Sequence, residues 1–454
     1  MKNDRDIRIF LDITETASNR LRTGIQRVVR RTIHAADKAS RELGVELMAV
    51  IAIEGAFHRV KDGHVLLRER PPERMAAPRR AVRRLKASAV ALGKRLLAAA
   101  PALASAARRM LYAHRASRVG HDSVEKHALV FQNGDVVVLL DSFWGSTALD
   151  AAVRAQDQGA SIATIVYDLI PLSHPQHFDE HAVVQFTAAM QRVLSHADYV
   201  FCISAFCAGE LRSLFPSCKA AIANTIEHFR LGSDFHSLMS APGREPEARL
   251  PEAFFDGEPV FLMIGTLEPR KGHAFVLDAL ERRWRAGGSG KLLILGKVGW
   301  KVEHVLRRIR LSPEFGGRLC VIHDATDMEL AAALQKSYAC IQASEVEGFG
   351  LPIVEAMQMG LPVLASDIPV FREIGGELPV YFSLGDPDNL VHAVDELVRR
   401  YPEVRARVAG FRWLTWDDAT VSLFSQVLAM HARRLPAPTG PTACPEPAEQ
   451  LSAR

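Results

Sequence analysis

Between residues 259 and 400 the chain alternates short apolar runs with longer amphipathic segments. The apolar runs are rich in Val, Ile and Leu, which is typical of buried parallel strands, and the segments between them have helical spacing of apolar residues. This alternation predicts a parallel, doubly wound α/β sheet. The predicted strands are 260–264, 292–295, 319–322, 339–343, 362–365 and 379–382, and the predicted helices are 275–285, 303–310, 329–337, 352–359 and 388–400.

The first half of the chain repeats this pattern less regularly. Its predicted strands are 7–11, 45–53, 136–140, 162–167 and 199–203, and its predicted helices are 24–38, 183–194 and 205–214. A segment near 239–251, rich in Pro and charged residues, reads as an exposed linker. We therefore predict two Rossmann-like domains, residues 1–245 and 246–434. The tail, 435–454, has five prolines in 20 residues, and we expect it to be disordered.

Composition excludes several classes of protein. The six cysteines form no Cys-x-x-Cys pair, which argues against a disulfide scaffold or a cysteine metal site and indicates reduced thiols. No apolar run reaches about 18 residues, so no membrane-spanning helix is expected. The N-terminus lacks the apolar core of a signal peptide. These features predict a cytoplasmic protein.

A basic block interrupts the first half of the chain. Residues 68–118 contain 14 Lys/Arg and two Asp/Glu, a local charge of +12, so the remainder of this +4 chain carries −8. Such a block indicates an anionic partner. Tyr112 is its single aromatic residue, so it lacks the stacking platforms that nucleic-acid bases need. We expect no nucleic-acid partner and predict an insertion that docks on an anionic membrane surface. The alternative is a disordered Ala/Arg-rich loop without function.

The most informative segment begins at Ser344 and reads Ser-Glu-Val-Glu-Gly-Phe-Gly-Leu-Pro-Ile-Val-Glu-Ala-Met. It follows a predicted strand and enters a helix with Pro352 near its first position. Ligands bind at this edge of a parallel sheet, and the N–H groups of a helix start suit a diphosphate. Glu347 in the loop and Glu355 in the first helical turn can face one crevice and hold sugar hydroxyls. Alternatively, Glu355 complements the helix dipole and Glu347 is a solvated loop residue.

A second segment, Gly265-Thr266-Leu267-Glu268-Pro269-Arg270-Lys271-Gly272-His273, joins the strand at 260–264 to a helix. In a parallel sheet it lies at the same edge as the first segment. Arg270 and Lys271 can neutralise a diphosphate leaving group there, the arginine as a fork and the lysine as a point charge. The alternative is a solvated turn with two surface cations.

These two segments resemble the retaining glycosyltransferases of family four, which have the GT-B fold and a Glu-x7-Glu signature. Glu347 and Glu355 match the signature, and the turn at 265–271 matches the family's diphosphate-binding turn. The resemblance is continuous over about 260–424 and implies two domains facing across a cleft. It implies that Glu347 contacts the transferred sugar and Glu355 the nucleotide ribose, while Arg270 and Lys271 stabilise the diphosphate. The remaining donor-binding candidates in this half are Gly265, Thr266, Gly348, Phe349 and Gly350.

One donor-side position departs from the family pattern. Many members have an arginine directly after the first glycine of the diphosphate-binding turn, where this chain has Thr266. We therefore expect the leaving group to depend more on Arg270.

The N-terminal half resembles the family more loosely. Gly24 and Arg27 lie where the family has a glycine-containing loop near the donor phosphates and the acceptor, although a plain helix start is an equal alternative. Tyr167 stands where many members have histidine, which leaves Asp168 as the acceptor-side catalytic candidate. Ser204 is expected to cap the next helix or to contact the donor.

His174 and His177 lie three residues apart in a loop that contains Pro175. We expect both histidines at the surface or in the acceptor cleft rather than as metal ligands.

The resemblance implies a same-face substitution in which the donor's own phosphate oxygen accepts the acceptor proton, with no metal ion. The turn at 265–271 together with Asp-Ile-Pro-Val-Phe-Arg-Glu at 367–373 is similar to mannosyltransferases of bacterial surface-polysaccharide assembly. This makes GDP-mannose the first expected donor and a glycan or lipid-linked oligosaccharide the expected acceptor.

Two alternative functions remain. A sugar-nucleotide 2-epimerase of the same fold would need its own acid/base set. A non-catalytic glycan- or membrane-binding paralogue would be expected to lose Glu347, Glu355 or Lys271.

Overall fold

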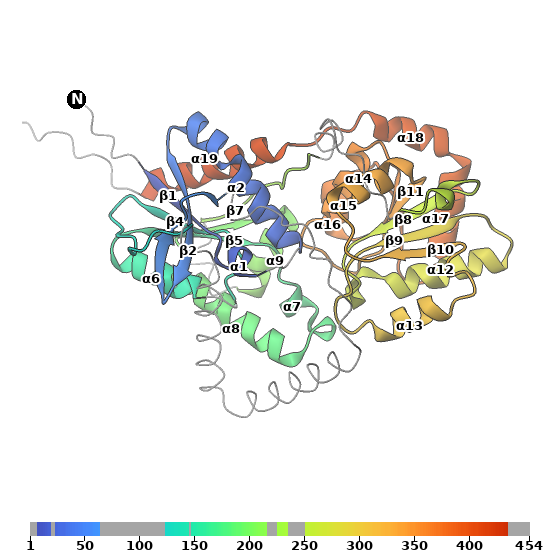
Figure 1. Ribbon diagram of the computed structural model, residues 1–454, viewed down its shortest axis with the longest axis horizontal. Helices are drawn as coiled ribbons and strands as arrows, with labels where there is room; N and C mark the ends of the chain where they lie inside the picture. Colours follow the sequence, from blue (N-terminus) through green and yellow to red (C-terminus); the bar gives the residue numbers. More distant parts are fainter. Residues whose placement is uncertain are drawn as a thin grey trace, which may run out of the picture.

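The computed structural model describes residues 7–19, 23–63, 123–144, 147–215, 225–234 and 250–434. The basic insertion predicted at 68–118, most of the predicted linker and the tail predicted at 435–454 lie outside these residues. Within the described ranges, no helix has the length and apolar character needed to cross a membrane. Figure 1 shows the described chain as two sheets, each flanked by helices.

The N-terminal domain is built on a seven-stranded sheet of order β3-β2-β1-β4-β5-β6-β7. Every neighbouring pair is parallel except β2 and β3, which form an antiparallel hairpin. The central strands β4 and β6 are buried along their whole length, as parallel strands covered by helices on both faces must be. The strands are β1 (Arg8–Asp12), β2 (Glu46–Ile53), β3 (Ala56–Arg59), β4 (Val136–Leu139), β5 (Ser161–Val166), β6 (Tyr199–Cys202) and β7 (Ile226–His228). The helices are α1 (Thr14–Ser18), α2 (Gly24–Leu43), α6 (Ala148–Asp157), α7 (Ile170–Ser173), η1 (Pro175–His177), α8 (Glu180–His196) and α9 (Ala205–Leu214).

The C-terminal domain has a six-stranded sheet of order β10-β9-β8-β11-β12-β13, in which every pair is parallel. This arrangement confirms the predicted doubly wound α/β class. The strands are β8 (Val260–Ile264), β9 (Lys291–Leu295), β10 (Leu319–Ile322), β11 (Ala339–Gln342), β12 (Val363–Ser366) and β13 (Val380–Phe382). The helices are η4 (Glu252–Phe255), η5 (Pro269–Lys271), α12 (His273–Arg285), α13 (Glu303–Leu311), α14 (Asp327–Lys336), α15 (Leu351–Gln358), α16 (Pro369–Gly375), α17 (Pro387–Arg399), α18 (Tyr401–Ala409) and α19 (Trp416–Arg434).

The last helix, α19, returns to the N-terminal domain. It packs along α2 (Figure 1), and its buried Phe424 belongs to the same apolar cluster as Val28 and Val29 of α2. At the far end of the helix, His431 Nδ1 lies 3.1 Å from the hydroxyl of Tyr199 in β6. The domain predicted at 246–434 therefore includes a helix that the structure places on the first domain, because the apolar face of α19 is buried there.

The two domains meet through loops at the carboxyl ends of their parallel strands. The loops after β5 and β6 of the first domain contact the loop after β11 of the second. Ser204 Oγ donates to the carbonyl of Gly348 at 2.7 Å, and a Cβ placed on Gly348 would lie 2.1 Å from the carbonyl oxygen of Tyr167. Because ligands bind at this edge of open parallel sheets, the interface is where a site is expected.

We predict that Phe424→Ala lowers the free energy of unfolding by about 3–5 kcal/mol, because it leaves a cavity between α19 and the N-terminal domain. Urea denaturation of the full chain measures the change. Ser425 is exposed on the same helix, and Ser425→Ala is the matched control, expected within about 0.5 kcal/mol of the parent. Equal stabilities for the two variants would show that α19 is not part of the cooperative fold.

Candidate active site

The loop after β11 turns into α15 through a glycine that no other residue could replace without strain. Gly350 is the N-cap of α15 with φ +107°, and a Cβ there would lie 2.9 Å from the buried ring of Phe371. Pro352 is the second residue of the helix, where its missing N–H costs nothing. The helix therefore begins at Leu351, and its first N–H groups lie at the carboxyl edge of the sheet.

A cationic turn lies directly against this loop. Arg270 and Lys271 end the short helix η5 after β8, and Gly272 follows with φ +70°. A Cβ on Gly272 would lie 2.1 Å from the carbonyl oxygen of Ala343, so the close approach of the two loops requires glycine. The backbone N–H of Glu345 donates to the carbonyl of Arg270 at 2.8 Å and ties the loops together.

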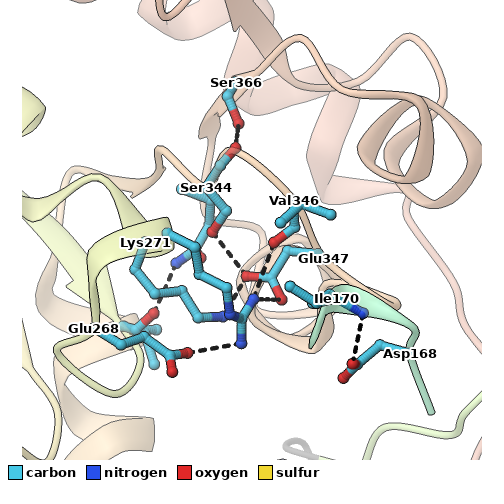
Figure 2. Close-up of polar contacts among 11 residues, drawn as sticks. Asp168, Ile170, Glu268, Lys271, Ser344, Val346, Glu347 and Ser366 are labelled. Atoms are coloured by element: carbon cyan, nitrogen blue, oxygen red, sulfur yellow. Dashed lines mark hydrogen bonds and ion pairs between the residues drawn. The ribbon is translucent and has the colours of Figure 1, made fainter. Parts of the chain in front are cut away.

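The carboxylate of Glu347 is the centre of this arrangement (Figure 2). Its Oε2 lies 2.8 Å from Arg270 Nη1, and its Oε1 accepts hydrogen bonds from Lys271 Nζ and, at 2.7 Å, from Ser344 Oγ. Burial opposes ionisation of Glu347, but the two cations outweigh it and hold its pKa at about 2. Glu347 is therefore a carboxylate at neutral pH.

Arg270 is itself fixed by three acceptors. Besides Glu347, its guanidinium contacts Glu268 Oε1 at 2.7 Å and the carbonyl of Val346 at 2.9 Å. Glu268 is buried, which raises the pKa of its carboxyl, and Arg270 opposes that rise. The arginine fork is thus held in one orientation by groups on both loops.

Glu355 lies in the second turn of α15, not in the first as predicted, because the helix begins at Leu351. Its side chain is 2% exposed, and its Oε1 lies 2.6 Å from Nη1 of Arg27 in the N-terminal domain. Its Oε2 is buried and has no hydrogen-bond partner among the described residues. Burial raises the pKa of Glu355, and Arg27 opposes the rise.

The structure places two of the N-terminal candidates, Gly24 and Arg27, in the first turn of α2 and the third, Asp168, after β5. Gly24 is the first residue of α2, a helix start with a Thr23–Gln26 capping box, and open space surrounds its Cβ position. Arg27, in the same first turn, reaches Glu355 across the interface. Asp168 follows β5 and accepts a hydrogen bond from the N–H of Ile170 at 3.1 Å.

Asp168 is close enough to the Glu347 cluster, which consists of Glu347, Arg270 and Lys271, for these charges to shift its pKa. Its pKa is raised by burial, and Arg270 opposes the rise. The neighbouring Tyr167 is buried and donates its hydroxyl hydrogen to the carbonyl of Leu140 at 2.6 Å. It is therefore part of the core beneath the loop.

Two of the donor-binding candidates, Phe349 and Thr266, differ in how exposed their side chains are. Phe349 is 3% exposed, and its ring packs edge-on against Trp413 at 6.1 Å between centroids. Its ring is thus a core contact, and its role in donor binding stays a prediction. Thr266 is half-exposed beside Gly265, whose φ is +142° and whose Cβ position lies 3.9 Å from Lys271 Cε. Gly265 and Thr266 thus border the turn that carries Arg270 and Lys271.

Sequence reasoning missed several members of the interface. Ser204 caps α9, as expected, by accepting from the N–H of Cys207 at 3.1 Å, but its bond to Gly348 was not foreseen. His177 is buried between the domains, and its Nε2 lies 3.0 Å from Glu345 Oε2 of the other domain. It is therefore not a surface residue, and its place in the acceptor cleft stays a prediction. Ser344 and Glu268 lie inside the two motif segments, at 344–357 and 265–273, which was the available signal for both. Within the described residues, no group of three or more His, Cys, Asp or Glu is arranged to hold a metal ion.

The chain is similar to known proteins both in sequence and in fold. Residues 245–411 match the family model described as glycosyl transferases group 1. The serotype-specific mannosyltransferase WbdA of Escherichia coli is 35% identical over 274 residues, which is 59% of this chain and 34% of WbdA. The O-antigen chain mannosyltransferase RfbU of Salmonella typhimurium is 27% identical over 155 residues, which is 34% of this chain and 42% of RfbU. The chain thus spans about a third of the length of WbdA.

Among solved structures, sucrose-phosphate synthase from Thermosynechococcus elongatus matches 94% of this chain and 100% of that chain, with a TM-score of 0.55 and 16% identity. At that identity the match shows the fold. Residues 245–411 of this chain are thus similar to the group 1 glycosyl transferases, and its two domains have the GT-B architecture.

Proposed function

We propose that this chain is a retaining, metal-independent glycosyltransferase that moves a hexose from a nucleotide sugar to a glycan or lipid-linked oligosaccharide. The observation that carries the proposal is the Glu347 cluster, in which a buried carboxylate, Arg270 and Lys271 lie at the N-terminus of α15. A helix N-terminus with two cations beside it favours a diphosphate.

The leaving group is stabilised by charge that is already in place. Glu268 and Glu347 hold the Arg270 guanidinium from two sides, so little reorganisation is needed when negative charge develops on the departing diphosphate. Lys271 adds a second cation at the same point. These side chains supply the positive charge that a bound metal ion supplies in other transferases, which is why we propose transfer without a metal.

The chemical step is a substitution on one face of the sugar. The bond from the anomeric carbon to the phosphate oxygen breaks, the bond to the acceptor oxygen forms on the same face, and the acceptor proton passes to the departing phosphate oxygen. Glu347 has a pKa of about 2, so at neutral pH it has no proton to donate. Its role is to orient Arg270 and Lys271 and to accept hydrogen bonds from hydroxyls of the transferred sugar.

Glu355 is suited to the nucleotide end of the donor. Its Oε1 is held by Arg27, while its buried Oε2 has no partner among the described residues. An unsatisfied buried acceptor is costly, and a ribose hydroxyl would satisfy it. We assign Asp168, on the other side of the interface, to the acceptor.

The choice of sugar rests on the relatives. WbdA and RfbU are named as mannosyltransferases, and RfbU as one that acts on the O-antigen chain. We propose mannose as the transferred hexose, GDP-mannose as the donor, and a role in surface-polysaccharide assembly in the cytoplasm.

A panel of nucleotide sugars tests the function directly. Purified protein is incubated with GDP-mannose, UDP-glucose and ADP-glucose, with and without a mannose-containing acceptor, in buffer containing EDTA. We expect acceptor-dependent release of GDP from GDP-mannose, undiminished by EDTA. Conversion of a donor without acceptor would indicate an epimerase, and no nucleotide release above background would indicate a binding protein. A strict requirement for Mg²⁺ or Mn²⁺ would contradict metal-independent transfer.

We predict that Lys271→Ala and Glu355→Ala each lower kcat/KM by about 100-fold or more, because each removes a group aimed at the donor. Initial rates of nucleotide release measure the loss, and circular dichroism melting checks that both variants fold. Arg285 is exposed at the end of α12, so Arg285→Ala is the matched control and should retain parental activity. Near-parental turnover in either site variant would overturn the assignment.

We also propose that the basic insertion, residues 68–118, docks the enzyme on an anionic membrane, where a lipid-linked acceptor would lie. Each Lys or Arg near an anionic leaflet contributes about 1 kcal/mol. At low salt, the full chain should co-sediment with liposomes that contain phosphatidylglycerol and remain in solution with neutral liposomes. Deletion of residues 70–115 should abolish co-sedimentation and retain activity on a short soluble acceptor. Failure of the full chain to sediment with the anionic liposomes would refute docking.

A further inference from the structure

Helix α9 of the N-terminal domain is capped by a residue of the C-terminal domain. The N–H of Ala205 donates to Glu373 Oε1 and the N–H of Phe206 to Glu373 Oε2, both at 2.8 Å. The N–H of Cys207 donates to Ser204 Oγ of the same domain. The first N–H groups of a helix have no partner within the helix, and a carboxylate there also complements the helix dipole. Glu373, on α16, thus completes the end of a helix in the other domain.

Ser204 forms a second bridge at the same place. While accepting from Cys207, its hydroxyl donates to the carbonyl of Gly348 at 2.7 Å, and the side chain is fully buried. Gly348 directly follows Glu347 in the chain. The N-terminal end of α9 therefore contacts two elements of the C-terminal domain, α16 and the loop that carries Glu347.

The backbone is consequently fixed on both sides of Glu347, and from different domains. The carbonyl of Val346 accepts from Arg270 within the C-terminal domain at 2.9 Å, and the carbonyl of Gly348 accepts from Ser204 of the N-terminal domain. Separation of the domains would leave the first bond in place and break the second. The backbone position of Glu347 thus depends on how the two domains meet.

The hydrogen bonds of Ser204 and Glu373 across the interface, here called the clasp, differ in one respect from the Arg27–Glu355 ion pair. The Arg27–Glu355 ion pair uses a carboxylate that we assign to the donor ribose, so it must readjust when donor binds. Ser204 and Glu373 have no assigned ligand, and their contacts can persist throughout the reaction. Arg372, the neighbour of Glu373, does not compete for it, because its guanidinium is paired with Asp367 at 2.7 and 2.9 Å.

We propose that Ser204 and Glu373 are positioning residues that set the Glu347 loop when the domains close. The kinetic part of this proposal rests on the proposed transferase function. Misplacement of a group by about 1 Å can cost 100-fold in rate, so a modest shift of the loop is enough to impair turnover. Donor affinity should change little, because Ser204 and Glu373 use their side chains to bond backbone groups across the interface.

Two sets of variants test the proposal. Glu373→Gln removes the charge and one of the two acceptor oxygens, and Glu377→Gln, at an exposed glutamate just after α16, is its control. Ser204→Asp keeps an N-cap acceptor but cannot donate to Gly348, whereas Ser204→Asn keeps both an acceptor and a donor. We expect Glu373→Gln and Ser204→Asp to lower kcat about 10-fold with KM for the donor within twofold of the parent. Glu377→Gln and Ser204→Asn should stay close to the parent.

Amide hydrogen exchange supplies a readout that does not depend on activity. Because N–H groups of a first helical turn exchange readily when unpaired, Ala205 and Phe206 should be protected in the parent and lose protection in Glu373→Gln, while Leu211 in the same helix keeps its protection. Loss of protection throughout α9 would indicate a purely structural role and overturn the proposal. So would unprotected Ala205 and Phe206 in the parent, or an unchanged kcat in a variant that has lost their protection. A protein that transfers no sugar would refute the proposed function, while the exchange measurement would still decide whether the clasp exists.

Discussion

A buried carboxylate paired with two cations holds the candidate site together. Burial of Glu347 alone would be costly, and a buried charge persists when it is paired and hydrogen-bonded. Arg270, Lys271 and Ser344 supply that pairing, and in doing so they bind the loop after β8 to the loop after β11. Gly272 makes the approach possible, since any side chain there would collide with the backbone of Ala343. The same contacts that stabilise the loops aim two cations at the start of α15.

The second constraint is that the site is shared between two domains. Arg27 of α2 is the ion-pair partner of Glu355, and Ser204 donates a hydrogen bond to the carbonyl of Gly348, the residue after Glu347. The first contact joins helices α2 and α15, and the second joins the loops after β6 and β11. Ligands bind in open α/β sheets at the carboxyl ends of the strands, where the second contact lies. Helix α19 crosses back onto the first domain. The domains are thus connected both at the site and at a distance from it, which suits a protein that closes around a ligand.

The sequence was sufficient to predict what depends on local pattern. Alternating apolar and amphipathic segments predicted the parallel strands of both sheets except β7, and Gly350 with Pro352 predicted the start of α15 to within one residue. The short edge strands β3 and β7 were missed, because few residues carry their signal. Glu355 was predicted in the first turn of this helix and lies at the start of the second, since α15 begins one residue earlier than predicted, at Leu351. Contacts across the interface could not be predicted, because nothing local to Arg27 or Glu373 encodes a partner in the other domain.

The central claim is that the Arg270–Lys271 turn and the start of α15 form a diphosphate site. Isothermal titration of the full chain with GDP and with GMP tests this most directly, because the two ligands differ only in the phosphate that the cluster should hold. The account predicts at least about 10-fold tighter binding of GDP, a difference of about 1.4 kcal/mol, and loss of that difference in Arg270→Met. Equal affinities for GDP and GMP, or a preference that survives the substitution, would contradict it.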